Sequence, residues 1–172
     1  MLYQPMPKIS VLILSLAITL GASTSCFSQS HGPIEVITPA EKNTLWINPG
    51  LYSYHFDQNR NFNSVNYGLG LEYQFSTVAS ITVGTYRNSY YQTSNYVGAY
   101  WMPLAVGPFH LGVVAGGFNG YSNTQNGGWF PAMLPVISIE GEWVGLNLIV
   151  IPSIADRVAG SLSFQLKIKA FD

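Results

Sequence analysis

Hydrophobic and polar positions alternate along several stretches of this chain. In "SLSFQLKIKAF", residues 161–171, leucine, phenylalanine and isoleucine take one face, and serine, glutamine and lysine take the other. The stretch "VNYGLGLEYQF", residues 65–75, repeats this pattern, and "WVGLNLIVI", residues 143–151, places its valines and leucines on one side. A period of two with one apolar face is typical of a half-buried β-strand. The pattern therefore predicts strands rather than helices.

Segments of this kind, separated by turn signals, predict eight strands of about ten residues each. Their expected ranges are 44–56, 65–76, 79–90, 95–105, 109–121, 130–140, 143–152 and 158–171. Short connections ("STV", "VGP", "GE") alternate with longer polar ones ("DQNRNFNS", "YQTS", "SNTQNGG", "SIADR"). Tight periplasmic turns and longer outer loops are typical of outer-membrane barrels. The sequence therefore predicts an all-β fold, an eight-stranded antiparallel outer-membrane β-barrel with an up-and-down meander.

The N-terminus has the features of a secretory signal peptide over residues 1–30. Lys8 is its only charge, "ISVLILSLAITLGA" supplies the apolar run, and small residues follow in "STSCFSQS". Residues 31–43 would then form a short periplasmic leader, and residues 44–172 the transmembrane barrel. No later segment offers about eighteen consecutive apolar residues, so a membrane-spanning helix is not expected. Cys26 falls in or beside the removed segment; its lipidation is the less favoured alternative, because Ser23 precedes it by three residues.

The composition narrows the class of protein further. Charged residues make up 9% of the chain, against about 25% in an ordinary soluble domain, and aromatic residues make up 14%. The seven lysines and arginines are scattered and form no patch, so nucleic-acid binding is not expected. No cluster of histidines and carboxylates suits a metal site, and we expect neither metal nor cofactor. A soluble lipocalin-like barrel stays open as an alternative, because small barrels also close in water around one ligand.

The lumen of the predicted barrel divides into two halves. Glu72 and Gln74 lie toward the inner end of their strand, where Glu72 is a candidate partner for Lys167 or Lys169. This half should be polar.

The outer half should be apolar. Ile149 and Ile151 face it, and Gly68 and Gly70 would leave space opposite them. Such a pocket suits an acyl chain that enters from the outer leaflet. The alternative is a lumen filled by its own side chains, the usual state of the smallest barrels.

Prolines stand in unusual places for a closed sheet. Pro131 and Pro135 fall within one predicted strand, and Pro152 ends the next. Proline cannot donate a hydrogen bond to the ladder, and unpaired backbone is costly in lipid. The three residues therefore predict a local gap in the wall.

A histidine and an Asn-Ser pair are expected at the same rim. If the chain starts on the periplasmic side, odd strands run outward, and His55 and Asn88–Ser89 end the first and third strands. His110 begins a strand at the opposite end, and His31 lies in the leader. His55 is thus the histidine able to meet Ser89, although one strand separates them and their strand axes should lie about 10 Å apart.

Such a pair points to acyl transfer. Serine is a weak nucleophile until a base accepts its proton, and histidine suits that role near neutral pH. A third group commonly orients the imidazole, and Asn88 is the candidate for it. For Asn88 and Ser89 to serve one site, the backbone must leave the strand there. The neighbouring tyrosines are assigned to an aromatic girdle at the membrane interface: Tyr86, Tyr90, Tyr91 and Tyr96.

The run "GTYRNSYY…YVGAYWMPLAVGPFHLGVVAGGF…PAMLPVISI…LIVIP", with "GLYSYHF…YGLGLEY" before it, resembles the outer-membrane lipid A palmitoyltransferase (PagP) family. The resemblance implies an eight-stranded barrel that moves a palmitoyl chain from a glycerophospholipid donor to lipid A, the acceptor, in the outer leaflet. It also implies a monomer surrounded by outer-membrane lipid. The family's histidine and Asp-Ser pair carry over onto His55 and Asn88–Ser89. Its proline-flanked access gaps carry over onto Pro131, Pro135 and Pro152.

Three departures mark a divergent member of that family. Asn88 stands where the family has aspartate, so no carboxylate is expected beside the imidazole. The region from Ser89 to Leu104 looks shorter, and Gly98 is only a candidate for the residue that sets acyl-chain length. The leader carries two prolines and cannot form an amphipathic helix. The rival hypotheses are a catalytically silent lipid-binding or structural barrel, and an esterase-like relative that uses water as acceptor.

Overall fold

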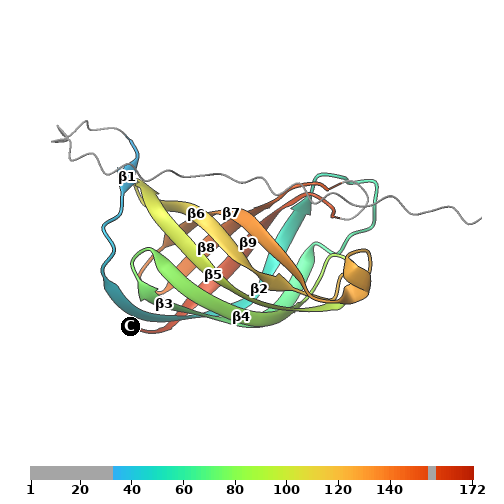
Figure 1. Ribbon diagram of the computed structural model, residues 1–172, viewed down its shortest axis with the longest axis horizontal. Coiled ribbons are helices and arrows are strands. Elements are labelled where there is room, and N and C mark those ends of the chain that lie inside the picture. Colours follow the sequence, from blue (N-terminus) through green and yellow to red (C-terminus); the bar gives the residue numbers. More distant parts are fainter. Residues whose placement is uncertain (1–32, 155–157) are drawn as a thin grey trace, which may run out of the picture. The chain divides into compact units, whose positions relative to one another are not determined.

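The structure, a computed structural model, describes residues 33–154 and 158–172 and is an all-β antiparallel barrel. Its strands are β1 (Glu35–Val36), β2 (Glu41–His55), β3 (Val65–Ser76), β4 (Ala79–Arg87), β5 (Thr93–Val106), β6 (Phe109–Phe118), β7 (Phe130–Glu140), β8 (Val144–Ile151) and β9 (Ser161–Phe171). Strands β2 to β9 pair in meander order, and β9 pairs with β2 to close an eight-stranded barrel (Figure 1). The predicted fold class is confirmed. The predicted signal peptide and Cys26 lie outside the described residues.

The connections alternate as the sequence predicts. Residues 56–64, 88–92 and 119–129 form longer loops at one end of the barrel, which we call the loop end (Figure 1, right). Residues 152–154 and 158–160, between β8 and β9, lie at the same end. Turns of two or three residues join the strands at the other end, the turn end. The 3-10 helix η1 (Gln125–Gly127) lies within the third loop. No helix in the described part of the chain is long and apolar enough to cross a membrane.

The leader is tied to the turn end of the barrel. Its two-residue strand β1 pairs with β5, where Glu35 lies opposite Ala105 and Val36 opposite Leu104. The N–H of Ile37 also donates to the carbonyl of Pro103 at 2.8 Å. Strand β4 no longer covers this part of β5, so β1 satisfies backbone groups that would otherwise have no partner.

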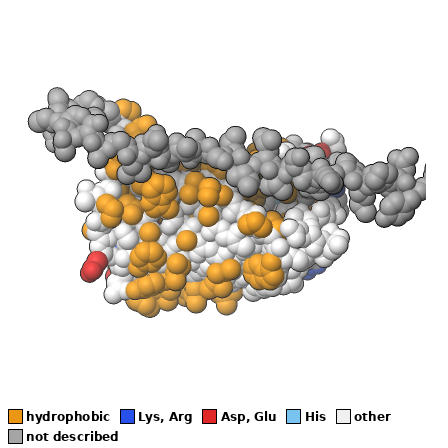
Figure 2. All heavy atoms as spheres, viewed as in Figure 1, with side chains coloured by type: hydrophobic (Ala, Val, Ile, Leu, Met, Phe, Trp, Pro, Cys, Tyr) orange, Lys and Arg blue, Asp and Glu red, His pale blue; other side chains and the backbone are white. Residues whose placement is uncertain are grey.

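The outer surface of the barrel is apolar. On β3, Leu69 is 62% exposed and Tyr67 76% exposed, whereas Glu72 and Gln74 on the other face are buried. Figure 2 shows hydrophobic side chains spread over the visible face, with the few charged side chains near its ends. A soluble barrel would cover this surface with polar groups, because large exposed apolar areas promote association. The surface is consistent with a membrane location.

A buried ion-pair network fills the lumen toward the turn end. Lys167 is fully buried, and its Nζ lies 3.1 Å from Glu72 and 2.7 Å from Glu140. Its ammonium group also lies 4.8 Å from the ring centroid of buried Trp46. The predicted pairing of Glu72 with Lys167 is therefore confirmed, whereas Lys169 pairs with Asp172 at the rim.

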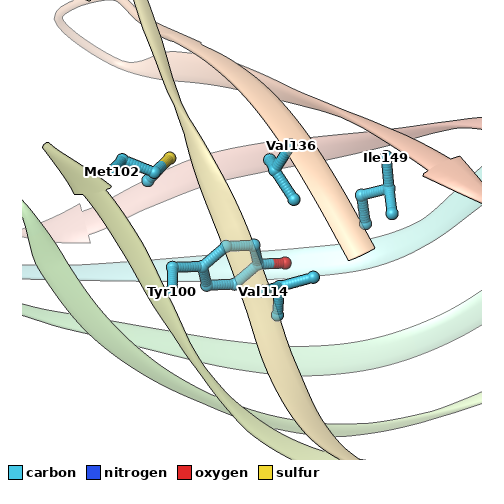
Figure 3. Close-up of a cluster of buried hydrophobic side chains, with 5 residues drawn as sticks. All are labelled: Tyr100, Met102, Val114, Val136 and Ile149. Atoms are coloured by element: carbon cyan, nitrogen blue, oxygen red, sulfur yellow. The ribbon is translucent and has the colours of Figure 1, made fainter. Parts of the chain in front are cut away.

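A hydrophobic cluster lies in the middle of the lumen, on the loop-end side of this network. Its members come from four consecutive strands, β5 to β8, and point toward one another (Figure 3). They are Tyr100, Met102, Val114, Val136 and Ile149. The hydroxyl of Tyr100 donates to Gln165 at 3.1 Å, and this hydrogen bond connects the cluster to the polar side chains toward the turn end. Between them, the network and the cluster close the lumen, so the barrel is not an open pore.

The wall of the barrel is incompletely paired between β7 and β8. The two strands pair only from Val136 opposite Ile149 to Glu140 opposite Gly145. The first half of β7, from Phe130 to Pro135, is paired with β6 alone. The prolines in this half have no N–H to donate to a ladder, and β8 ends at Ile151, before it reaches the start of β7. We call this unpaired stretch the β7–β8 seam.

Replacing Lys167 by methionine should strongly destabilise the barrel, because Glu72 would remain buried without its cation. Removing one partner of a buried pair costs about 3–5 kcal/mol in the free energy of unfolding. The measurement is urea unfolding in detergent micelles, followed by tryptophan fluorescence and gel mobility. Lys169→Met is the matched control, and it should change little because its partner Asp172 lies in water. Equal stability of both variants would show that the network is dispensable.

Candidate functional site

His55 faces the lumen because the inward-facing positions of β2 switch from even to odd residue numbers partway along the strand. Trp46 and Asn48, at even positions, face inward at the start of the strand, but Ser53 and His55, at odd positions, face inward at its end. The register to β3 shifts between Asn48 and Gly50, as in a β-bulge. Gly50 has φ +125°, a backbone conformation that favours glycine. Without this irregularity, the side chain of His55 would face outward.

Ser89 reaches the same place because the chain leaves β4 at Arg87 and turns sharply. The side-chain oxygen of Asn88 accepts hydrogen bonds from the N–H groups of Tyr90, at 2.9 Å, and Gln92, at 3.0 Å. An asparagine that bonds its own following backbone in this way stabilises a turn. Tyr91 completes the turn with φ +60°. The backbone therefore leaves the strand geometry at Asn88 and Ser89, two neighbours that would face opposite sides of a regular strand.

The structure brings His55 and Ser89 into hydrogen-bonding contact. Nε2 of His55 lies 2.8 Å from Oγ of Ser89, and His55 is only 3% exposed. The loop 56–64 bridges the intervening strand, because the N–H of Asn63 donates to the carbonyl of Ser89 at 2.9 Å. A serine hydroxyl at this distance from a buried imidazole has the geometry of a nucleophile and its general base.

Asn88 does not orient the imidazole. Its side-chain N–H groups donate to Oγ of Ser94 at 2.9 Å and to the carbonyl of Gly120 at 2.8 Å. Nδ1 of His55 is buried and has no hydrogen-bond partner among the described residues. The orienting role predicted for Asn88 is therefore wrong. This fully buried side chain instead holds the turn that presents Ser89.

The imidazole is held by aromatic stacking. The ring of Phe62 lies against that of His55, with centroids 4.7 Å apart and an interplanar angle of 27°. Tyr90 packs edge-on against Phe62, and the Arg60 guanidinium lies 4.9 Å from the centroid of the Phe62 ring. The side-chain amide of Gln58 donates to the carbonyl of His55. Loop 56–64 thus surrounds the histidine that it follows in sequence.

Ser89 lies on the wall of an apolar cavity. The cavity has a volume of about 500 Å³ and reaches the β7–β8 seam, where Pro131 and Pro152 contribute to its lining. Its apolar lining includes Phe118, Phe130, Met133, Leu134, Ile151 and Ile154. A second cavity of about 60 Å³, which also borders Ser89, continues toward the hydrophobic cluster. Cavities that hold small ligands commonly measure about 300–1,000 Å³.

The residues predicted to form the acyl pocket divide into two groups. Gly98, Ile149 and Ile151 line the smaller cavity. Gly68 and Gly70 do not border open space: the carbonyl of Thr85 and Tyr86 lie directly over Gly68, and the hydroxyl of Tyr96 lies over Gly70. The prediction that these two glycines leave room for a ligand is therefore wrong. Among the access prolines, Pro135 lies in the unpaired half of β7 but does not line either cavity.

Sequence reasoning missed the inward-facing tyrosines. Tyr96 is 8% exposed in the lumen, and the hydroxyls of Tyr86 and Tyr121 lie 2.7 Å apart. Tyr90 lines the large cavity, so of the four tyrosines assigned to a girdle, Tyr91 alone is largely exposed. The period-two pattern of β4, whose serine and threonine face the lumen, would have placed Tyr86 inside. Burial raises the pKa of the Tyr121 hydroxyl, which therefore stays neutral.

Over residues 33–154 and 158–172, no group of three histidine, cysteine, aspartate or glutamate side chains is arranged to hold a metal ion.

Comparisons with known proteins support the fold. No protein-family model matches the chain, and no curated protein matches it. Among solved structures, the chain is similar to the de novo designed protein TMB2.3, determined by NMR in solution. The match covers 76% of this chain and 96% of TMB2.3, with 19% sequence identity and a TM-score of 0.51. TMB2.3 is a designed transmembrane β-barrel, and at this identity the similarity shows the fold alone.

Replacing Asn88 by aspartate should destabilise the loop end of the barrel. A carboxylate cannot donate to Ser94 and would face the carbonyl of Gly120 without a proton. The expected loss is about 1–3 kcal/mol in the free energy of unfolding, the cost of leaving a buried acceptor unsatisfied. The check is heat-modified gel migration, with Asn59→Asp in the exposed loop as control. A variant as stable as the parent would contradict this role for Asn88.

Proposed function

We propose that this chain is an outer-membrane acyltransferase that moves a palmitoyl-type chain from a glycerophospholipid to lipid A. The observation that carries the proposal is the contact between His55 and Ser89 at the wall of the large apolar cavity. A reactive hydroxyl placed beside space for an acyl chain suits an enzyme that cleaves and forms lipid esters. The sequence resemblance to the lipid A palmitoyltransferase family leads to the same reaction.

The pair supplies nucleophile and base for the first half-reaction. Oγ of Ser89 attacks the ester carbonyl of the donor, and its proton passes to Nε2 of His55. When the intermediate collapses, Nε2 returns this proton to the oxygen of the departing lysophospholipid. The acyl group then remains on Ser89. In the second half-reaction, a hydroxyl of lipid A gives its proton to Nε2 and attacks the acyl carbon. The bond between that carbon and Oγ of Ser89 then breaks, and Nε2 returns the proton to Oγ, which restores both residues.

The cavity supplies binding energy for the acyl chain. Burying apolar surface stabilises a bound chain by about 0.8 kcal/mol for each buried methylene group. The β7–β8 seam offers a lateral route, because the wall there lacks a ladder between the strands. A lipid in the surrounding bilayer can then bring its chain into the lumen without crossing the polar rim. Pro131 and Pro152, which border both the seam and the cavity, keep this route open.

We infer the location and the partners from the same arrangement. The apolar outer surface supports a barrel embedded in lipid, and the predicted signal peptide leads us to propose the bacterial outer membrane. With the loop end outward, Ser89 and the seam lie at the level of the outer leaflet, where lipid A resides. We propose that the protein acts as a monomer.

One observation favours a second candidate, a catalytically silent lipid-binding barrel. The imidazole has no hydrogen-bonded group at Nδ1, and serine enzymes of this kind generally use such a group. In this alternative, the cavity binds a lipid chain and the contact between His55 and Ser89 is structural. An esterase that uses water as acceptor is a variant of the first proposal, with the same residues in the same roles.

Mass spectrometry of lipid A from cells that express the chain tests the proposal. We expect a mass gain of one palmitoyl-type group, reduced at least about a hundredfold in Ser89→Ala and in His55→Ala, because general-base catalysis contributes roughly 10²–10⁴-fold. All three proteins are compared at equal levels in the membrane. Ser122→Ala, an exposed serine in the neighbouring loop, is the matched control and should retain activity.

Two results would count against the proposal. If lipid A is unchanged while the barrel is folded and present, the silent lipid-binding barrel is the better account. If lipid A gains mass equally with all variants, the acyl group is transferred by another protein of the cell. Release of free fatty acid without a change in lipid A would identify the esterase.

A further inference from the structure

The proposed reaction creates a positive charge on His55 that no carboxylate in the described part of the chain pairs with. Nε2 of His55 can accept the proton of Ser89 only if the imidazole is neutral and carries its hydrogen on Nδ1. Proton transfer then produces an imidazolium inside a site where His55 is 3% exposed. A buried charge without a partner is costly.

Among residues 33–154 and 158–172, the charged groups near the loop end do not solve this problem. Asp57 is exposed, and its side chain accepts from the N–H of Asn59. Arg60 and Arg87 are cations, and they lie over the rings of Phe62 and Tyr91. Nδ1 of His55 has no hydrogen-bond partner in the described part of the chain. The group that orients the ring from its Nδ1 side and stabilises its charge is therefore neither an ion-pair partner nor a hydrogen-bond acceptor of the described residues.

The ring of Phe62 is the group in the right place. It lies nearly parallel to the imidazole, and the two centroids are 4.7 Å apart. A cation within about 6 Å of an aromatic face is attracted by the negative potential of that face, most strongly where water is excluded. The interaction needs no acceptor at Nδ1, so it is compatible with the unpartnered nitrogen.

We propose that Phe62 is the positioning residue of the site: its ring fixes the plane of the His55 imidazole, and its π face stabilises the imidazolium. This role rests on the proposed acyl transfer. In a Ser-His-Asp triad, the carboxylate both orients the histidine and stabilises its charge. Here, one aromatic ring performs both tasks through stacking.

The neighbours of Phe62 keep its ring in place. Tyr90 packs against it edge-on at 5.5 Å, and the Arg60 guanidinium lies over the ring, 4.9 Å from its centroid. The backbone of the next residue, Asn63, is bonded to the carbonyl of Ser89. The serine, the histidine and the aromatic ring therefore belong to one connected unit. Arg60 lies at the exposed surface, where solvent and salt screen its repulsion of the imidazolium.

The test uses the full chain in detergent micelles and p-nitrophenyl palmitate as the probe substrate. Wild type is compared with Phe62→Leu, which keeps an apolar side chain but removes the π face, and with Phe62→Tyr and Phe62→Trp, which keep it. We expect kcat to fall roughly 5- to 30-fold in Phe62→Leu, with KM unchanged because the ring does not border the acyl cavity. The two aromatic variants should restore kcat to within about threefold of wild type.

Each other outcome overturns the inference in a recognisable way. Wild-type kcat in Phe62→Leu would show that the ring has no role. An equal loss in all three variants would show that only the shape of Phe62 matters. An increase in KM at constant kcat would place Phe62 in substrate binding. If wild type is no faster than Ser89→Ala, the proposed function itself fails, and this inference fails with it.

Discussion

A closed barrel must pair the edge of every strand with the next, and the prolines of β7 work against this along one stretch of wall. Between Phe130 and Pro135, β7 has no ladder to β8. In lipid, an unpaired backbone would be costly, so this stretch marks a place where the structure departs from the most stable sheet. The cavity reaches the wall there, and Ser89 lies on its lining. The site therefore depends on a defect in pairing that the sequence places at one seam.

Side-chain contacts between several strands fill the rest of the lumen. Lys167, between Glu72 and Glu140, joins β9 to β3 and β7 across the lumen. The hydrophobic cluster above it joins β5 to β8. Well-packed contacts toward the turn end and an open seam at the loop end suit the proposed acyl transfer, because His55 and Ser89 would have to stay in place while a flexible chain enters and leaves.

Much of this arrangement could be predicted from the sequence. The period-two pattern locates the strands within a few residues, and the prolines locate the seam. The contact between His55 and Ser89 follows from the order of strands, but its geometry does not. That geometry depends on the bulge at Gly50, which reverses the phase of β2, and on the turn that Asn88 stabilises. A uniform alternation applied along residues 44–56 cannot reveal such a change of phase.

Two other features could not be predicted from the sequence, for a related reason. Gly68 and Gly70 indicate space on their own strand, but the side chains that fill this space come from β4 and β5. Likewise, the stacking of Phe62 on His55 depends on the path of an irregular loop. Pattern reasoning describes one segment at a time, whereas these contacts are set by long-range packing.

Covalent labelling can test whether Ser89 is the proposed activated nucleophile at the wall of an acyl cavity. The folded protein in detergent is treated with a long-chain alkyl fluorophosphonate, and the modified residue is located by tandem mass spectrometry of its peptides. If Ser89 is the nucleophile, we expect an adduct on Ser89 and on none of the buried serines that face the lumen (Ser53, Ser80, Ser94, Ser138, Ser161 and Ser163). This adduct should be lost in His55→Ala. An unlabelled Ser89, or labelling that does not depend on His55, would contradict the account.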